Sequence, residues 1–186
     1  YGRENEIEVH MPLDDSGELH WLVFRKSGFS GEGREDLLLT DAPALSLEDA
    51  LSSVMDCFTV QPGNYTWTFE EDGEGKSFAA CGAHPLDDVP FVHMPVLTLP
   101  AYNGLDSIPY FFSCAVMPDS VTVRKWKASA AGNPDAQADS VTVLPEGTAL
   151  VELEKDSIYE FILEWEQKRL EETGYCGTAS YAFVTQ

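Results

Sequence analysis

Basic residues are scarce in this sequence. Eleven Lys and Arg stand against 32 Asp and Glu, which gives a formal net charge of −21 at pH 7. A surface of that charge repels phosphate backbones and anionic lipid headgroups alike. We therefore expect no nucleic-acid partner, and we interpret the scattered acidic residues as a solvated surface.

Long apolar runs are absent too. No stretch approaches the roughly 18 to 20 consecutive apolar residues of a membrane-spanning helix, and the richest run, Pro109 to Pro118, is short and bounded by prolines. We predict no direct membrane insertion by these residues. The start at Tyr1 rather than Met indicates that an upstream segment was removed, by signal processing or by the choice of fragment, so a membrane anchor in a longer protein stays open.

The familiar catalytic and nucleotide-binding motifs are missing. The sequence contains no G-x-S-x-G, no S-x-x-K, no P-loop, no dinucleotide-binding glycine fingerprint and no H-E-x-x-H. Acyl transfer requires a nucleophile activated by an oriented base, and no local motif supplies that pair. We predict that the chain is not an enzyme and that it carries no cofactor.

Cysteines are few and widely spaced. Cys57, Cys81, Cys114 and Cys176 include no C-x-x-C pair, which disfavours a structural zinc site or a thioredoxin-like motif. An even number permits disulfides in any of three connectivities. Free thiols are the alternative, and the sequence leaves both open.

Histidines are also few, and their spacing does not suit a metal site. His10 and His93 each precede a methionine, a pair of residue types that suits copper. Adjacent side chains in a strand point to opposite faces, so such a pair cannot bind one ion without a bend. With His20 and His84 isolated from these pairs, we predict no bound metal.

Alternating apolar and polar residues fill much of the chain and predict strands. Residues 64–69 and 77–81 are in phase across a Gly-rich acidic turn, which predicts an antiparallel hairpin with Trp67 buried. Residues 159–165 and a segment through Tyr181 and Phe183 predict a second pair of core strands, joined through a short helix at 166–172 that ends at Gly174.

A longer helix is predicted over Ser46 to Cys57, because Ser46 and Asp49 form a capping-box pattern and the apolar residues after them fall at helical spacing. One helix amid many strands favours an all-β fold. We predict an immunoglobulin-like β-sandwich with one or two short helical insertions. Residues 1–186 are predicted to form a single module, with a sub-boundary near 101–119 as the alternative.

The strongest local group of chemically active side chains lies in the segment 80–88, where Cys81 and His84 are three residues apart. A catalytic thiol–imidazole pair would need a third, orienting group that the sequence does not show. The favoured interpretation is a structural turn in which His84 bonds to the backbone. Loops at the ends of a sandwich are its usual binding elements, and our candidates for ligand binding are His84, Asp87, Asp88, Tyr102, Asn103 and Asp106.

Several short motifs resemble a known group of proteins. They are Gly63-Asn64-Tyr65-Thr66-Trp67, Ala80-Cys81-Gly82-Ala83-His84-Pro85-Leu86, Asp119-Ser120-Val121-Thr122-Val123-Arg124-Lys125-Trp126, Tyr159-Glu160, Glu164-Trp165 and the segment from Gly174 to Val184. Together they resemble the extracytoplasmic C-terminal region of Firmicutes membrane peptidases of the β-lactam-sensor/antirepressor type and of related lipoproteins. The resemblance covers residues 57–186 and implies a location outside the cytoplasm, either secreted or at the cell surface. It implies no β-lactam binding, because S-x-x-K is absent, and no zinc peptidase chemistry, which belongs to a membrane domain outside this sequence.

Three functions follow as hypotheses. The first is a noncatalytic extracytoplasmic recognition or sensor module that binds an extracellular ligand or protein. The second is a structural spacer or interaction domain, which predicts convex, charged loop ends. The third is a hydrolase of unfamiliar type, which requires a cluster of groups with perturbed proton affinities.

Overall fold

The computed structural model describes the chain except for residues 1–5, 13–18, 26–38, 55 and 88–93. The chain forms two compact units, Tyr1–Leu37 and Leu38–Gln186. The first contains the antiparallel hairpin of β1 (Glu6–Pro12) and β2 (Leu19–Arg25). The prediction of one module over 1–186, or of a boundary near 101–119, remains a prediction.

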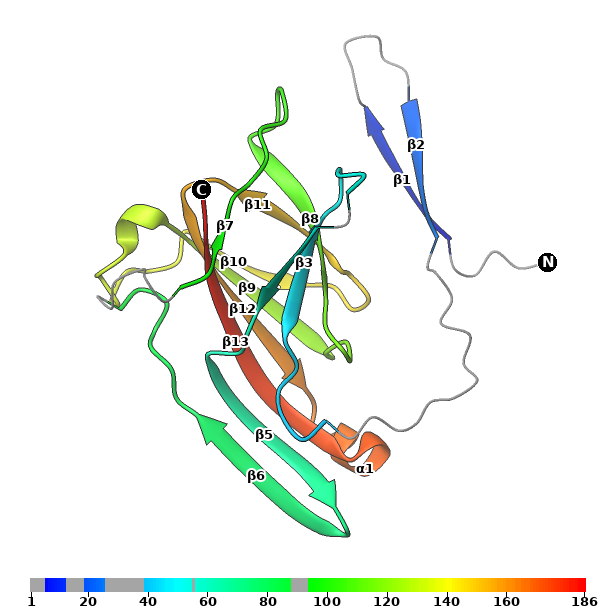
Figure 1. The fold of residues 1–186 in the computed structure, drawn as a ribbon, viewed down its shortest axis with the longest axis vertical. Coiled ribbons are helices and arrows are strands. Elements are labelled where there is room, and N and C mark those ends of the chain that lie inside the picture. The colour runs from blue at the N-terminus through cyan, green and yellow to red at the C-terminus, as the bar shows by residue number, and fades with distance from the viewer. Residues whose placement is uncertain (1–5, 13–18, 26–38, 55, 88–93) are drawn as a thin grey trace, which may run out of the picture. The chain divides into compact units, whose positions relative to one another are not determined.

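The second unit is a sandwich of two sheets (Figure 1). Its larger sheet has the strand order β10-β9-β12-β13-β5-β6, with β7 paired in parallel to the end of β13. Its strands are β5 (Asn64–Glu71), β6 (Glu74–Ala80), β7 (Val96–Leu97), β9 (Ser120–Lys127), β10 (Ser140–Leu144), β12 (Ser157–Trp165) and β13 (Tyr175–Thr185). The smaller sheet has the order β11-β8-β3-β4. Its strands are β3 (Leu45–Asp49), β4 (Cys57–Val60), β8 (Ser107–Ser113) and β11 (Leu150–Glu154).

The core lies between these two sheets. Alternate residues of facing strands enter one apolar cluster, as the period of two along a strand requires. The fully buried members include Leu45, Leu47, Phe112, Leu153, Phe161, Leu163, Tyr181 and Phe183. The predicted all-β sandwich is confirmed, while its immunoglobulin-like character remains a prediction.

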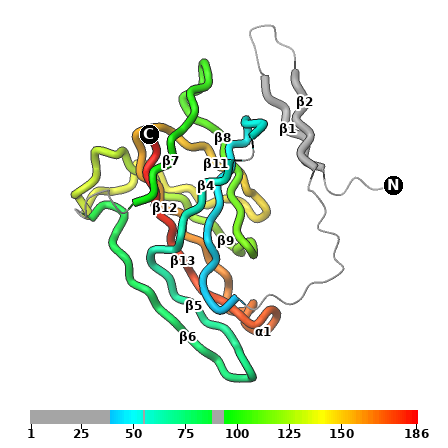
Figure 2. The backbone as a smooth tube through the Cα atoms, viewed as in Figure 1, coloured from blue at the N-terminus to red at the C-terminus, as the bar shows by residue number. Residues whose placement is uncertain are grey.

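The central pair of the large sheet is β12 with β13, whose register runs from Ser157 opposite Thr185 to Trp165 opposite Gly177. This confirms the predicted pairing of the two C-terminal strands. Between them lies helix α1 (Lys168–Thr173), which ends at Gly174 in the left-handed conformation, φ 81°. Figure 2 shows α1 at the end of the sandwich opposite the C-terminus.

An ion pair fixes α1 to the start of β9. The Arg169 side chain bonds to both carboxylate oxygens of Asp119, at 2.7 Å from Nε and 3.0 Å from Nη2, and the Glu166 amide donates to the same carboxylate at 2.8 Å. Burial raises the pKa of Asp119, but these bonds outweigh it and hold the pKa below the ordinary 3.8. The short helix is therefore held in place by the ion pair and hydrogen bonds to Asp119.

The helix predicted over Ser46 to Cys57 is wrong. The segment begins as β3, turns through residues 50–54 and enters β4. Leu45 and Leu47 are each 0% exposed, a spacing of two that fits a strand paired on both sides, to β4 and to β8. The Asp49 carboxylate accepts the Leu51 amide at 2.8 Å and so stabilises a turn instead of a helix start.

The described part of the chain contains no helix with the length and apolar character needed to cross a membrane.

Candidate functional site

Four connections lie at the same end of the sandwich as the C-terminus (Figure 1). They span residues 50–54, 98–106, 128–139 and 155–156. Their common position follows from the strand registers, because β8 starts at Ser107 opposite Glu154, and β9 ends at Lys127 opposite Ser157. We call these four connections the loop end.

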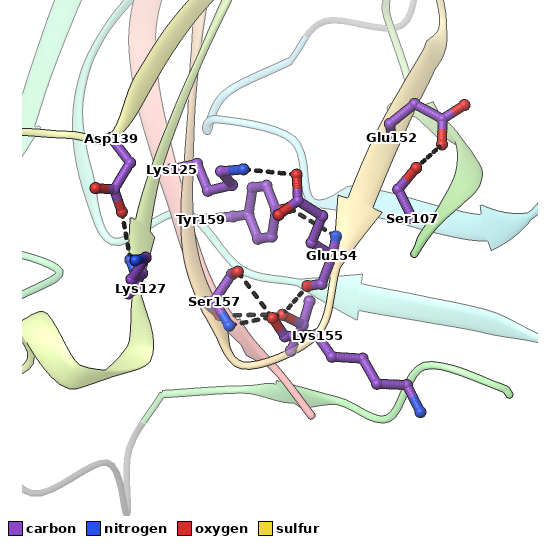
Figure 3. A network of polar contacts seen from close by, with 10 residues as sticks. Ser107, Lys125, Lys127, Asp139, Glu152, Glu154, Lys155, Ser157 and Tyr159 are labelled. Atoms are coloured by element: carbon purple, nitrogen blue, oxygen red, sulfur yellow. Dashed lines mark hydrogen bonds and ion pairs between the residues drawn. The ribbon is translucent and has the colours of Figure 1, made fainter. Parts of the chain in front are cut away.

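The turn between β11 and β12 is tied down by buried side chains (Figure 3). Asp156 takes a positive φ of 52°. The Glu154 amide donates to the Tyr159 hydroxyl at 2.8 Å, and the Thr185 hydroxyl donates to the Glu154 carbonyl at 2.6 Å while accepting from the Ser157 amide at 3.2 Å. Burial raises the pKa of Tyr159 to about 12, so the phenol stays neutral at physiological pH. This part of the network is structural.

Charged side chains around this turn form one ion pair and one hydrogen bond to the backbone (Figure 3). Lys125 Nζ lies 2.6 Å from Glu154 Oε1 and thereby joins the two sheets at their edge. The Asp139 carboxylate accepts the Lys127 amide at 2.9 Å. Within the described residues, the ammonium groups of Lys127 and Lys155 form no ion pair. The loop end thus borders one ion pair, while within the described residues the charged side chains of its own four connections, such as Asp106 and Lys155, form none.

Within the connection 98–106, residues 101–106 are anchored at their base and exposed at their tip. We call these residues the connection 101–106. The Tyr102 hydroxyl donates to Asp49 Oδ2 at 2.7 Å, and this hydrogen bond raises the pKa of Tyr102. Gly104 takes a φ of 82°, which a residue with a side chain rarely adopts. Asn103, Leu105 and Asp106 are exposed beyond it, with Leu105 at 49%.

The turn at 81–87 is a closed structural unit. Nδ1 of His84 accepts the Leu86 amide at 3.1 Å, and the His84 amide donates to Asp87 Oδ2 at 2.7 Å. The ring lies edge-on to Trp126, with 6.2 Å between centroids. His84 and Asp87 therefore stabilise the turn, and Asp88 lies outside the described residues.

A second, smaller core on the outer face of the large sheet was not predicted from the sequence. Leu86, Trp126 and Ile158 are buried there, and the connection 128–139 covers them. Trp126 Nε1 donates to the Ala136 carbonyl at 3.1 Å. The sequence did contain a signal for this second core. The period of two along β9 and β12 places Trp126 and Ile158 on the face away from the main core, yet both residues are apolar.

The structure thus divides the sequence-predicted residues into two groups. Tyr102, Asn103 and Asp106 lie on the loop end, and His84 and Asp87 lie in the turn over the second core. No hydrogen bond or ion pair joins the two groups within the described residues. In that same part of the chain, no three His, Cys, Asp or Glu residues gather in a way that could hold a metal ion.

All four cysteines are free thiols. Cys57 and Cys81 are exposed, and Cys81 forms no hydrogen bond with His84, whose Nδ1 is occupied by the backbone. Burial raises the pKa of Cys114 to about 12 and also raises the pKa of Cys176. The sulfhydryl of Cys114 donates to the Val116 carbonyl at 2.9 Å.

We expect an aromatic disulfide reagent at neutral pH to modify Cys57 and Cys81 in the native chain, and all four thiols after unfolding, because reactivity follows exposure and thiolate content. Replacing both exposed cysteines by serine should abolish native labelling. Cys81 should react at the rate of an ordinary thiol with or without His84→Ala. Fewer than four thiols in the unfolded, unreduced chain, or fast labelling of Cys81 that depends on His84, would contradict this assignment.

Comparisons with known proteins leave the family open: no protein-family model matches the chain, and no curated protein or solved structure matches it either.

Proposed function

We propose that this chain is a noncatalytic, extracytoplasmic recognition module that binds an extracellular protein or other ligand through the loop end. The observation that carries the proposal is the build of the connection 101–106. Its base is fixed by the bond between Tyr102 and Asp49, and its tip exposes an apolar side chain, Leu105, between two polar ones. A loop whose base is already fixed in the free state loses less conformational entropy on binding.

A neighbouring connection extends this exposed surface. Val54, in the connection 50–54, is 64% exposed at the same end, and the Ala50 amide donates to the Pro109 carbonyl at 2.9 Å, which fixes the start of that connection to β8. Two large apolar side chains on adjacent, anchored loops supply contact area for a partner.

The noncatalytic part of the proposal is supported by the two buried hydroxyl groups of the β11–β12 turn. Thr185 donates to a backbone carbonyl, and so does Ser157, to the Lys155 carbonyl at 3.0 Å. A hydroxyl engaged in this way is not paired with a base that would activate it. The extracytoplasmic location rests on the sequence resemblance.

The structural spacer is the second candidate, and two polar contacts beside the loop end favour it. Lys125 with Glu154, and Ser107 with Glu152 at 2.8 Å, turn polar groups toward one another rather than toward a ligand. A binding assay distinguishes the two candidates.

The assay measures cosedimentation of the dye-labelled chain with isolated Gram-positive cell walls, with their surface proteins present or stripped by protease. Leu105→Ser combined with Asn103→Ala should weaken binding at least tenfold. Glu146→Gln, an exposed change on the β10–β11 connection at the opposite end, should leave it unchanged. Binding lost on stripping would identify a protein ligand, and binding retained would identify the wall polymer.

Two results would overturn the proposal. No cosedimentation above that of an unrelated acidic protein would favour the spacer, and release of soluble wall fragments over time would favour a hydrolase. The location is tested with Cys57 and Cys81, which a membrane-impermeant maleimide should reach on intact cells that produce the protein. Labelling only after lysis would exclude an extracytoplasmic site.

A further inference from the structure

Strand β10 is the terminal strand of the large sheet, paired with β9 alone among the described strands. Its sequence, Ser140-Val141-Thr142-Val143-Leu144, has no charge, proline or glycine. Val141 is 60% exposed and Val143 is 67% exposed. Natural sheets protect such edges with charges, prolines or bulges, because an unprotected edge pairs with other strands.

The direction of the free backbone groups on β10 follows from the registers of β9 with its two neighbours. Ala128 donates its amide to the Asp156 carbonyl at 2.8 Å, and these two residues continue the pairing of β9 with β12. Hydrogen-bonded and non-hydrogen-bonded pairs alternate in an antiparallel ladder. The even-numbered residues of β9 therefore bond to β12, and the odd-numbered ones bond to β10.

The same alternation of hydrogen-bonded and non-hydrogen-bonded pairs continues between β9 and β10. Lys125 lies opposite Ser140, and Val123 lies opposite Thr142, so Ser140 and Thr142 use their amides and carbonyls within the sheet. The amides and carbonyls of Val141 and Val143 point away from β9. The free edge thus offers two donors and two acceptors, from residues two positions apart.

We propose that β10 pairs with β10 of a second copy of this chain, antiparallel and about a two-fold axis at Thr142. In that arrangement Val141 of each copy lies opposite Val143 of the other copy. The two free amides and two free carbonyls of each strand are then all used, in four hydrogen bonds between the copies. The valines meet in two cross-strand pairs on one face, and the two Thr142 side chains meet on the other. Both kinds of pair are favourable across strands, and the contact is isologous, as a closed dimer requires.

Among the described residues, the structure that flanks β10 leaves room for the second copy. Thr142 lies opposite the buried Val123, so its side chain is on the face of the sheet that carries the core. The side chain of Thr142 is nevertheless exposed. The small sheet therefore does not extend over β10. The opposite terminal strand, β6, lacks this character, since it contains Glu74, Gly75 and Lys76, which protect an edge.

Local charge also favours β10 over the rest of the surface. The chain carries −21, and two copies repel one another over most approaches. Next to β10, however, Arg124 and Lys125 of β9 are paired with Glu160 and Glu154, and β9 adds the positive charge of Lys127. The remaining long-range repulsion is screened by salt, so the dimer should strengthen when ionic strength rises.

Two five-residue strands form a small contact, below the roughly 1,200 Å² of a stable complex. We therefore expect a reversible dimer with a Kd between about 1 μM and 1 mM. Sedimentation velocity over that concentration range should show a monomer–dimer equilibrium for the full chain, shifted toward dimer by salt.

Val143→Pro tests the edge directly. It removes an amide that faces away from β9, so the sheet itself loses no hydrogen bond while the dimer loses two of four. We expect at least a tenfold weaker dimer with an unchanged far-UV circular dichroism spectrum. Val143→Thr keeps the amide and the shape and should dimerise as the wild type does. A monomeric wild type, or a dimer that Val143→Pro leaves intact, would overturn the proposal.

A cross-linking pair tests the register. In a chain with Cys57→Ser and Cys81→Ser, Thr142→Cys places two thiols at the two-fold axis, where Cα atoms of a non-hydrogen-bonded pair lie about 4.5 Å apart, within disulfide range. Ser140→Cys places them about 13 Å apart along the strands. Mild oxidation should give a covalent dimer with Thr142→Cys and little with Ser140→Cys. Equal cross-linking, or cross-linking only through Ser140→Cys, would reject this register.

Discussion

Trp67→Ala should lower the free energy of unfolding by about 3–5 kcal/mol, the usual cost of emptying a large aromatic core site. The side chain is 1% exposed. Its ring lies edge-on to Trp165, with 5.2 Å between centroids, and is stacked on Tyr175 at 5.6 Å. Its Nε1 donates to the Leu39 carbonyl at 2.7 Å, so truncation both opens a cavity and leaves an acceptor without its partner.

Two controls separate these contributions in denaturant unfolding followed by far-UV circular dichroism. Trp67→Phe keeps most of the ring volume but loses the bond to Leu39, so its cost should be smaller than that of alanine. Thr66→Ala, the exposed neighbour on the other face of β5, should change stability by less than about 0.5 kcal/mol. A loss below about 1 kcal/mol for Trp67→Ala would show that the two tryptophans do not form the packed centre described above.

The β5–β6 hairpin was predictable because every signal for it is local. Asp72 and Gly73 have positive φ values of 55° and 79°, the two-residue turn that an Asp-Gly step favours. The alternation on both sides then determines which residues face the core, and Trp67 is buried as predicted. The same reasoning placed the strand pair of β12 and β13, whose apolar residues alternate over long runs.

The error at Ser46 to Cys57 has the opposite origin. Leu45 and Leu47 are spaced as in a strand, but the apolar residues that follow them are spaced as in a helix. A short apolar segment does not distinguish a strand from a helix. What decides is pairing with β8, more than 60 residues later in the sequence, and no local pattern contains that information. Tertiary pairing therefore overrides the capping-box signal.

The candidate site shows the same division between local and distant contacts. The turn of His84 and Asp87 closes over three residues and was predicted as structural. The bond that anchors the loop end, from Tyr102 to Asp49, joins residues 53 apart, and the second core under Trp126 brings together three separate segments. Sequence patterns identified the exposed loop residues but not the contacts that hold them.

Gly177→Ala should destabilise the chain by about 3 kcal/mol, at the upper end of the usual cost of overpacking. Gly177 lies opposite Trp165 on one side and opposite Trp67 on the other. A Cβ placed on it would lie 2.2 Å from the Thr66 carbonyl oxygen and 2.7 Å from Cε3 of Trp67. The nearer atom belongs to the backbone of β5, so no side-chain rotation relieves the overlap and β5 must move away from β13.

Gly75→Ala is the matched control, because Gly75 lies in β6 of the same sheet and has nothing within 4 Å of its would-be Cβ. Its effect should stay within about 0.5 kcal/mol. Combining Gly177→Ala with Trp67→Phe should not restore stability, since the overlap with the Thr66 carbonyl remains. If Gly177→Ala unfolds at the same denaturant concentration as Gly75→Ala, β5 and β13 are not in the close contact on which the packing of both tryptophans depends.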